Sequence, residues 1–140
     1  MVLVCIGIVI GFVGYKTQEA IDYTDSFTKE LLKNPEPYVG KEVTLTLDKR
    51  KYFAIVDFLE PSRKHVDEYG VVYEGGYRFY HETIKPDGSV VSVDLYYLGD
   101  PISIKGAKAV KLTGVIKKMK LMQEDRMVYV IEMYKAEPIH

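Results

Sequence analysis

The sequence predicts a small all-β domain behind one N-terminal helical region, and three observations support that fold class. Hydrophobic and polar residues alternate over residues 42–48, where Val43, Leu45 and Leu47 point one way and the residues between them point the other, as in a strand with one buried face. The alternation returns over residues 110–117. The chain has 12 tyrosines and no tryptophan, and tyrosine packs well on half-exposed sheets. Two such strands bracketing a short β-rich chain indicate a closed barrel.

The length and composition limit the organisation of the chain. Its 140 residues are enough for a single hydrophobic core. We divide it into a hydrophobic anchor or signal segment (residues 1–15), a connecting helix (residues 16–34) and a β-barrel domain (residues 35–138). The one cysteine, Cys5, excludes an intrachain disulfide, a Cys-based zinc site and a CxxC redox pair. The formal net charge of -1 argues against a dedicated nucleic-acid-binding protein.

The N-terminal segment is apolar. Residues 2–15 carry no charge, and as a helix they would span roughly 21 Å, which is short of the hydrocarbon core of about 30 Å. They lack the basic region and the small-residue cleavage site of a typical signal peptide. We expect a membrane anchor or an uncleaved signal, with a buried hydrophobic element as the alternative.

The first half of the domain is expected to contain one helix and two strands. Apolar residues near one face predict a helix over 17–33, which Pro35 and Pro37 end. The strand over 42–48 follows, and then a basic turn at 49–51. Residues 52–59 are apolar on both faces, so we expect a buried central strand there.

The second half is expected to contain the remaining strands. Residues 62–70 are polar and predict an irregular segment with room for one helical turn. Residues 71–84 are strand-like and broken at Gly75 and Gly76. Because Pro86-Asp87-Gly88 is a strong turn signal, residues 77–84 and 89–98 should pair as a hairpin. The last two strands are expected over 107–118 and 127–136.

Three stretches resemble small prokaryotic OB-fold domains. The run NPEPYVGKEV at residues 34–43 is similar to the segment that leads into their first curved strand, and AVKLTGVI at 109–116 and YVIE at 129–132 are similar to their last two strands. The resemblance covers roughly residues 30–47 and 107–137. It implies a five-stranded Greek-key OB-like barrel, with residues 60–100 as an elaborated central hairpin. Membrane-anchored members of this class also imply that the domain is extracytoplasmic.

The OB-like resemblance implies single-stranded nucleic acid as one ligand class, because such barrels combine basic residues for phosphates with aromatic residues for base stacking. Residues 101–126 contain seven basic and two acidic residues, against four and nine in residues 52–100. Ordinary solvated strand faces are the favoured explanation of this separation, because alternating strands need polar outer faces. The candidate ligand-binding residues are Lys49, Arg50, Lys51, Tyr52, Tyr96, Tyr97, Lys117, Lys118 and Lys120.

A haem or metal carrier is a remote alternative. His65 and Tyr69 form an HxxxY spacing similar to the haem-attachment motif of membrane-anchored periplasmic haem chaperones. In that family the motif follows the barrel, whereas here it falls inside the domain. The three histidines are far apart in the sequence, so we expect no metal site and no cofactor.

The sequence offers no recognisable catalytic set, because no nucleophile stands beside a base and an orienting group. Asp57 lies in the expected buried strand, and we expect it either to face a barrel end or to pair with a Lys or Arg. We therefore expect a non-catalytic, membrane-anchored binding or interaction module. A protein partner is suggested by the tyrosine-rich section, because tyrosine is enriched in contact surfaces. Its members are Tyr69, Tyr73, Tyr77, Tyr80, Tyr96 and Tyr97.

Overall fold

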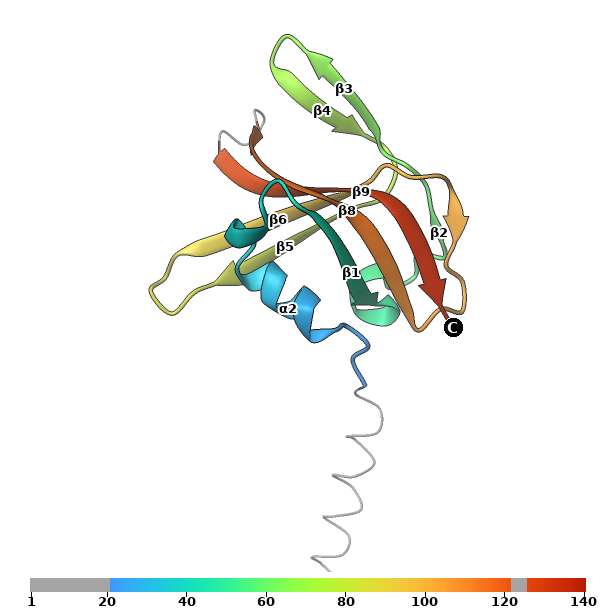
Figure 1. The fold of residues 1–140 in the computed structure, drawn as a ribbon. Helices are drawn as coiled ribbons and strands as arrows, with labels where there is room; N and C mark the ends of the chain where they lie inside the picture. The colour runs from blue at the N-terminus through green and yellow to red at the C-terminus, as the bar shows by residue number, and fades with distance from the viewer. Residues whose placement is uncertain (1–20, 122–125) are drawn as a thin grey trace, which may run out of the picture.

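The computed structural model describes residues 21–121 and 126–140, and these residues are mostly β (Figure 1). They contain one α-helix, α2 (Ser26–Lys33), a 3-10 turn, η1 (Glu36–Tyr38), and a π-helical turn, η2 (Lys49–Phe53). The strands are β1 (Glu42–Asp48), β2 (Phe58–Leu59), β3 (Arg63–Asp67), β4 (Gly70–Glu74), β5 (Arg78–Ile84), β6 (Val90–Tyr97), β7 (Ile102–Ser103), β8 (Ala109–Leu121) and β9 (Arg126–Ile139).

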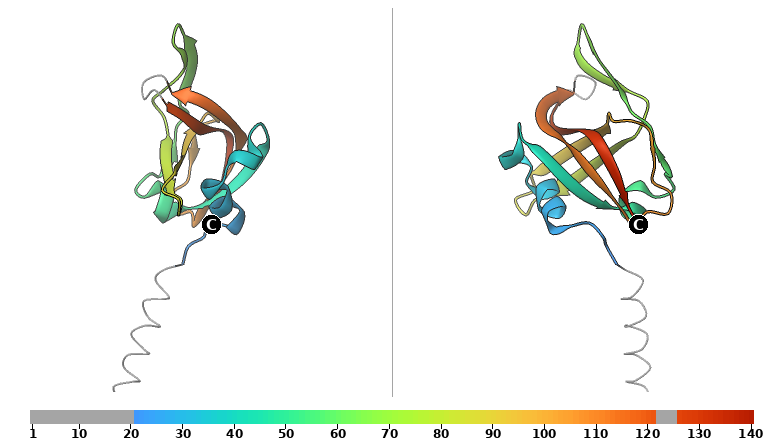
Figure 2. Two further views of the ribbon diagram at one scale, coloured as in Figure 1. Left: turned by 90° about the vertical axis from the view of Figure 1, so that its left-hand side faces the viewer. Right: turned by 45° about the vertical axis from the view of Figure 1, so that its right-hand side comes forward.

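Five strands form one sheet in the order β1-β8-β9-β6-β5, and the sheet curls into a half-barrel (Figures 1 and 2). Neighbouring strands are antiparallel except β6 and β9, which are parallel. Within the described residues β1 and β5 are the two edges of this sheet. Two short ladders, β2 with β7 and β3 with β4, lie outside it. The expected mostly β, barrel-like fold is therefore confirmed, with the side between β1 and β5 left open.

The main core lies on the inner side of the curled sheet. The alternation in β1 buries Val43, Leu45 and Leu47 at 6%, 0% and 0% exposure. The same core takes apolar residues from the other strands, from η2 and from α2: Leu31, Leu32, Phe53, Leu59, Val91, Val93, Leu95, Tyr97, Ile104, Val110, Leu112, Ile116, Ile131 and Met133. Burying one such side chain stabilises the fold by about 1.5–3 kcal/mol.

Helix α2 fills part of the open side, where it contacts both β1 and β5. Leu31 and Leu32 are its buried apolar residues. Asp25 caps the helix, because its carboxylate accepts a hydrogen bond from the Thr28 amide at 2.8 Å. The helix ends at Lys33, since a residue before a proline disfavours the helical backbone. The predicted helix over 17–33 is thus too long within the described part, and residues 17–20 lie outside it.

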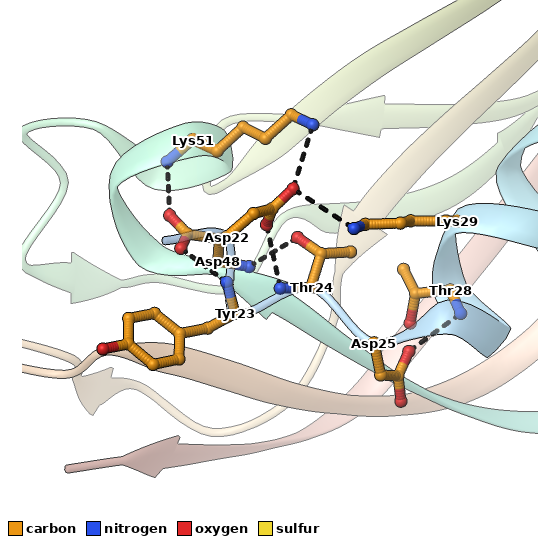
Figure 3. Close-up of polar contacts among 8 residues, drawn as sticks. All are labelled: Asp22, Tyr23, Thr24, Asp25, Thr28, Lys29, Asp48 and Lys51. Atoms are coloured by element: carbon orange, nitrogen blue, oxygen red, sulfur yellow. Dashed lines mark hydrogen bonds and ion pairs between the residues drawn. The ribbon is translucent and has the colours of Figure 1, made fainter. Parts of the chain in front are cut away.

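Residues 22–25 run along the free edge of β1 instead of extending the helix, and Thr28 in the first turn of α2 also bonds to β1 (Figure 3). The Asp48 carboxylate accepts from the Tyr23 amide at 2.9 Å, and the Asp48 amide donates to the Thr24 hydroxyl at 3.1 Å. Further along, the Thr46 amide donates to the Thr28 hydroxyl at 2.9 Å. The backbone groups of this edge, which would otherwise attract another strand, are therefore used within the chain.

Two further expectations are wrong. Residues 52–59 are not a buried central strand: η2 and a turn occupy most of this stretch, and only Phe58 and Leu59 pair, in β2. The turn forms because Asp48 caps η2 through the Lys51 amide at 2.9 Å, after which the backbone turns sharply at Ala54. Residues 62–70 are also not irregular, because most of them form β3 and the turn into β4.

The other strand predictions are confirmed. The hairpin of β5 and β6 forms as expected. β8 begins and ends later than expected, and β9 extends beyond the expected strand at both ends. Gly75 and Gly76 separate β4 from β5 with φ of 62° and 67°, values that favour glycine. The apolar segment 2–15 lies outside the described residues, and among those that are described no helix is long and apolar enough to cross a membrane.

Candidate functional site

A cluster of charged and tyrosine side chains lies on the side of β6 and β9 that faces away from the main core. Alternation in β6 directs Leu95 inward, so its neighbours Asp94 and Tyr96 point outward, and Glu132 does the same in β9. The base of the β3–β4 hairpin meets them there. We call these residues the outer-face cluster: Lys64, Tyr73, Arg78, Asp94, Tyr96, Lys117 and Glu132.

Glu132 is the centre of one half of this cluster. Its side chain is buried, with 7% of the residue exposed. The Tyr73 hydroxyl donates to Oε2 at 2.9 Å, Lys64 Nζ lies 2.7 Å from the same oxygen, and Lys117 pairs with Oε1. Burial alone would raise the pKa of Glu132, but the hydrogen bonds from Lys117, Lys64 and Tyr73 outweigh it and place this pKa below its usual value. Glu132 is therefore a carboxylate held between three donors.

Asp94 is the centre of the other half. It is fully buried, and Arg78 binds it with two parallel bonds, from Nε to Oδ1 at 2.9 Å and from Nη2 to Oδ2 at 2.7 Å. The Tyr96 hydroxyl donates to Oδ2 at 3.2 Å. A bidentate arginine pair of this kind is strong and geometrically specific. Asp94 therefore fixes Arg78, at the start of β5, on the outer face of β6.

A stacked tyrosine pair joins the two halves. The rings of Tyr73 in β4 and Tyr96 in β6 lie 3.8 Å apart between centroids and are nearly parallel, at 13°. Burial, and then the hydrogen bond to Glu132, raise the pKa of Tyr73. The Arg78 guanidinium lies 5.4 Å from the Tyr96 ring centre. The outer-face cluster thus clamps the base of the β3–β4 hairpin to the barrel.

The rest of the hairpin is exposed in β3 and half-buried in most of β4. Every residue of β3 is exposed, and no residue of β3 or β4 is buried. Val66 and Tyr69, close to the turn between the two strands, are 74% and 63% exposed. Figure 1 shows the hairpin projecting from the end of the half-barrel opposite to residue 21. His65 and Tyr69, the two residues with the haem-like spacing, are both exposed on this hairpin.

The basic turn at residues 49–51 lies at the other end, in η2. Lys49 is buried, and its Nζ lies 3.1 Å from the Ala54 carbonyl and 3.3 Å from Asp57 Oδ1. Asp57 thus has the basic partner that the sequence predicted, although it does not lie in a strand. Lys51 pairs with Asp22 at 3.3 Å, whereas Arg50 is exposed.

Tyr52, the aromatic residue of the same turn, is half-buried and begins a short aromatic row. Its ring centre lies 5.6 Å from Phe79 and 6.4 Å from His81, and Lys51 Nζ lies 5.5 Å from the Tyr52 ring centre. Burial, and then the charge of Lys51, lower the pKa of His81. The result is a half-exposed row of rings beside Lys51 and its exposed neighbour in the sequence, Arg50.

The structure does not bring the two predicted basic groups together. Asp48 pairs with Ala109 in the β1–β8 ladder, so Lys117 lies eight residues farther along β8, or roughly 26 Å away from the start of η2. Lys117 contacts Glu132, whereas the next residue, Lys118, contacts Glu36 on the other side of the strand.

The remaining candidate residues have different surroundings. Lys120 lies exposed near the end of β8. Tyr96 and Tyr97 are buried at 7% and 2% exposure, so neither presents an open ring face. Across residues 21–121 and 126–140, no three His, Cys, Asp or Glu side chains meet in a group that could hold a metal ion.

Sequence reasoning missed the residues that organise the outer-face cluster. Asp94 is the single acid of β6, and Glu132 lies within the otherwise uncharged run 127–134 of β9, which was the available signal. Lys64 comes from a segment far from Glu132 in the sequence, so no local pattern could name it, whereas Arg78 lies across the predicted β5–β6 hairpin from Asp94. No protein-family model, curated protein or solved structure matches this chain.

Proposed function

We propose that this chain is a non-catalytic interaction module with an OB-like barrel, anchored at a membrane through residues 2–15, that binds a protein partner through its β3–β4 hairpin. The OB-like identity is supported by the non-sequential order β1-β8-β9-β6-β5 and by the curled, partly open sheet, which fit a five-stranded Greek-key barrel. The inserted β3–β4 hairpin corresponds to the elaboration expected in the middle of the chain.

The observation behind this proposal is a hairpin that is firmly attached but contributes no residue to the main core. A two-stranded hairpin is marginally stable by itself, and β3 and β4 bury no residue. Tyr73 and Lys64 nevertheless fix its base to Glu132, and Tyr73 stacks on Tyr96. A clamp at the base and exposed Val66 and Tyr69 near the turn suit a rigid arm that presents contact residues to a partner. Preorganisation of this kind reduces the entropy lost on binding.

The same geometry supports a β3–β4 hairpin that points away from the membrane. Residue 21 meets the barrel beside Asp48, whereas the hairpin is clamped near Lys117, at the opposite end of β8. An anchor in residues 2–15 would then leave the hairpin pointing away from the bilayer, on the extracytoplasmic side. Protease added to intact cells should digest the domain, and survival of the domain until lysis would contradict this orientation.

Crosslinking tests the partner surface. A photoreactive amino acid placed at Val66 in the full chain, in the cells that produce it, should give one defined protein adduct, and Tyr73→Ala should abolish that adduct because the hairpin loses its orientation. Ile84 is the matched control, because it is 75% exposed at the tip of the other hairpin. Equal adducts at both positions, or none at Val66, would contradict the proposal.

Single-stranded nucleic acid is the second candidate, supported by the row of Tyr52, Phe79 and His81 beside Arg50 and Lys51. Fluorescence anisotropy of mixed-sequence single strands should then show affinity that falls steeply between about 50 and 200 mM salt. Arg50→Ala should weaken binding, whereas the distant Lys117→Ala should not. Absence of binding at both salt concentrations would exclude this candidate.

A further inference from the structure

We propose that the end of the barrel around η2 is a docking surface for an anionic phospholipid bilayer, with Ile55 inserted among the headgroups. We call this surface the rim and define it as residues 21–23, 49–58 and 103–108. The inference deepens the proposed function, since it rests on the anchoring of the chain through residues 2–15. In this proposal the rim sets the orientation of the domain on the membrane.

The rim is one continuous surface although its segments are distant in sequence. The Lys49 amide donates to the Lys108 carbonyl at 2.9 Å, and the Ile104 amide donates to the Asp57 carbonyl at 2.9 Å. Lys51 joins the first segment through its ion pair with Asp22. Figure 3 shows this last junction, where the chain from residue 21 meets η2.

Ile55 is the most prominent apolar residue of the rim, at 94% exposure. It follows Ala54, whose φ of 45° and ψ of -115° are unusual for a residue with a side chain. Two hydrogen bonds fix the turn: Lys49 Nζ donates to the Ala54 carbonyl, and the Val56 amide donates to the Phe53 carbonyl at 2.7 Å. Strained backbone of this kind persists at functional sites when the surroundings over-determine it. Here the strained turn holds the Ile55 side chain exposed to solvent.

Further apolar side chains surround it. Ile21 is 54% exposed and Phe58 is 49% exposed, and both belong to the rim. Single exposed apolar residues are ordinary on protein surfaces, but here three of them lie at one end of the barrel together with a basic group. Apolar residues that are flanked by basic residues suit the boundary between headgroups and acyl chains.

The charge of the rim complements an anionic surface. Arg50, Lys105 and Lys108 are exposed, and within the described part of the chain they form no ion pair. By contrast, both acids of the rim are paired, the exposed Asp57 with Lys49 and the half-buried Asp22 with Lys51. Basic residues close to an anionic leaflet are attracted to it within about a Debye length.

The chain between the apolar segment and Ile21 is short, so it keeps the rim close to the membrane. From Lys16, the first charge after the apolar segment, the chain to Ile21 can span no more than roughly 20 Å. Residues 22–28 are then bonded to β1, so the barrel cannot swing freely away from this attachment. An anchor in residues 2–15 therefore holds the rim, and not the hairpin, against the headgroups.

The test uses the full chain with Cys5→Ser, reconstituted into vesicles, and a single environment-sensitive fluorophore attached through Ile55→Cys. On phosphatidylcholine vesicles with about 30% phosphatidylglycerol, we expect blue-shifted emission and quenching by lipid-attached doxyl groups. Pure phosphatidylcholine should give several-fold weaker quenching. A fluorophore attached through Val66→Cys, on the distal hairpin, is the matched control and should remain in water on both vesicles.

The charge dependence and the anchor are measured separately. Arg50→Glu with Lys105→Glu should return the position-55 signal to its value on neutral vesicles. Equal water exposure at position 55 on both vesicles would overturn the docking surface. Flotation of the full chain with pure phosphatidylcholine vesicles reports the anchor alone. If flotation fails, the anchor is wrong, and the signal at position 55 with anionic vesicles still decides whether the rim binds lipid.

Discussion

Truncation of Tyr73 should release the β3–β4 hairpin without unfolding the barrel. Tyr73 provides two of the contacts at the hairpin base, the hydrogen bond to Glu132 and the stack on Tyr96. Tyr73→Phe removes only the first, and Tyr73→Ala removes both. Because β3 and β4 bury no residue in the core, the loss should appear as local opening of the hairpin.

The magnitude follows from these two contacts. A hydrogen bond to a charged acceptor contributes about 1.5–3 kcal/mol, but Glu132 keeps Lys64 and Lys117, so we expect about 1–2 kcal/mol for Tyr73→Phe. The stacked pair adds about 0.5–1.5 kcal/mol beyond its buried area, which gives about 3 kcal/mol for Tyr73→Ala. Opening of the hairpin should become about ten-fold more frequent in the first variant and on the order of 100-fold in the second.

Hydrogen exchange of the full chain measures this opening. Amides of β3 and β4 should exchange faster in the order wild type, Tyr73→Phe, Tyr73→Ala, while amides of β8 and β9 keep their protection. Tyr69→Ala is the control, because this exposed residue of the same hairpin makes no contact with the outer-face cluster. Unchanged exchange in Tyr73→Ala, or an equal loss of protection in β8 and β9, would refute the clamp.

Four further outcomes are expected. The pKa of Glu132 lies below its usual value, so its contribution to stability is present above the pKa of an unfolded glutamate, about 4.3. This contribution is lost as the pH falls through the folded pKa. Hydrogen exchange of the hairpin should show this pH dependence, and Glu132→Gln should abolish it. Asp25→Ala should destabilise the fold by about 1 kcal/mol in urea denaturation, because α2 loses its cap. Ala54→Gly should raise stability by up to about 1 kcal/mol in the same assay, because it relieves the positive φ. Gly114→Ala should cost about 1–3 kcal/mol, since a Cβ there would collide with the Glu132 carbonyl oxygen and lie 2.8 Å from the Met133 Cα, opposite the bulge in β9.

Periodicity predicted the strands that have one buried face. In β1 the pattern and the structure agree from Glu42 to Leu47, whereas Asp48, which the alternation places on the solvent face, is buried. The hairpin of β5 and β6 was predictable for a different reason, because Asp87 and Gly88 lie in a tight turn in which the Gly88 amide donates to Lys85 at 2.9 Å. Local chemistry was sufficient for both.

The errors occur where local chemistry is ambiguous. The apolar run at residues 52–59 fits a buried strand, but Asp48 caps η2 and Ile55 is left in water. The β3–β4 hairpin has no alternation to detect, because β3 is exposed on both faces. The outer-face cluster depends on the parallel register that places Tyr96 beside Glu132, and no short stretch of sequence encodes that register.

The way residues 22–28 lie on β1 also determines how the domain responds to a mechanical load. They run antiparallel to β1, from Asp48 towards Thr46. A pull applied at residue 21 would therefore act first on the ion pairs of Asp22 with Lys51 and Lys29, then on the bond between Tyr23 and Asp48, and only afterwards on the bonds of Thr24 and Thr28 to β1. The apolar contacts of α2 are stressed last. A small force would detach a few residues from β1 and so lengthen the chain between residue 21 and the barrel, while the core stays intact. These residues would bind to β1 again once the force is removed.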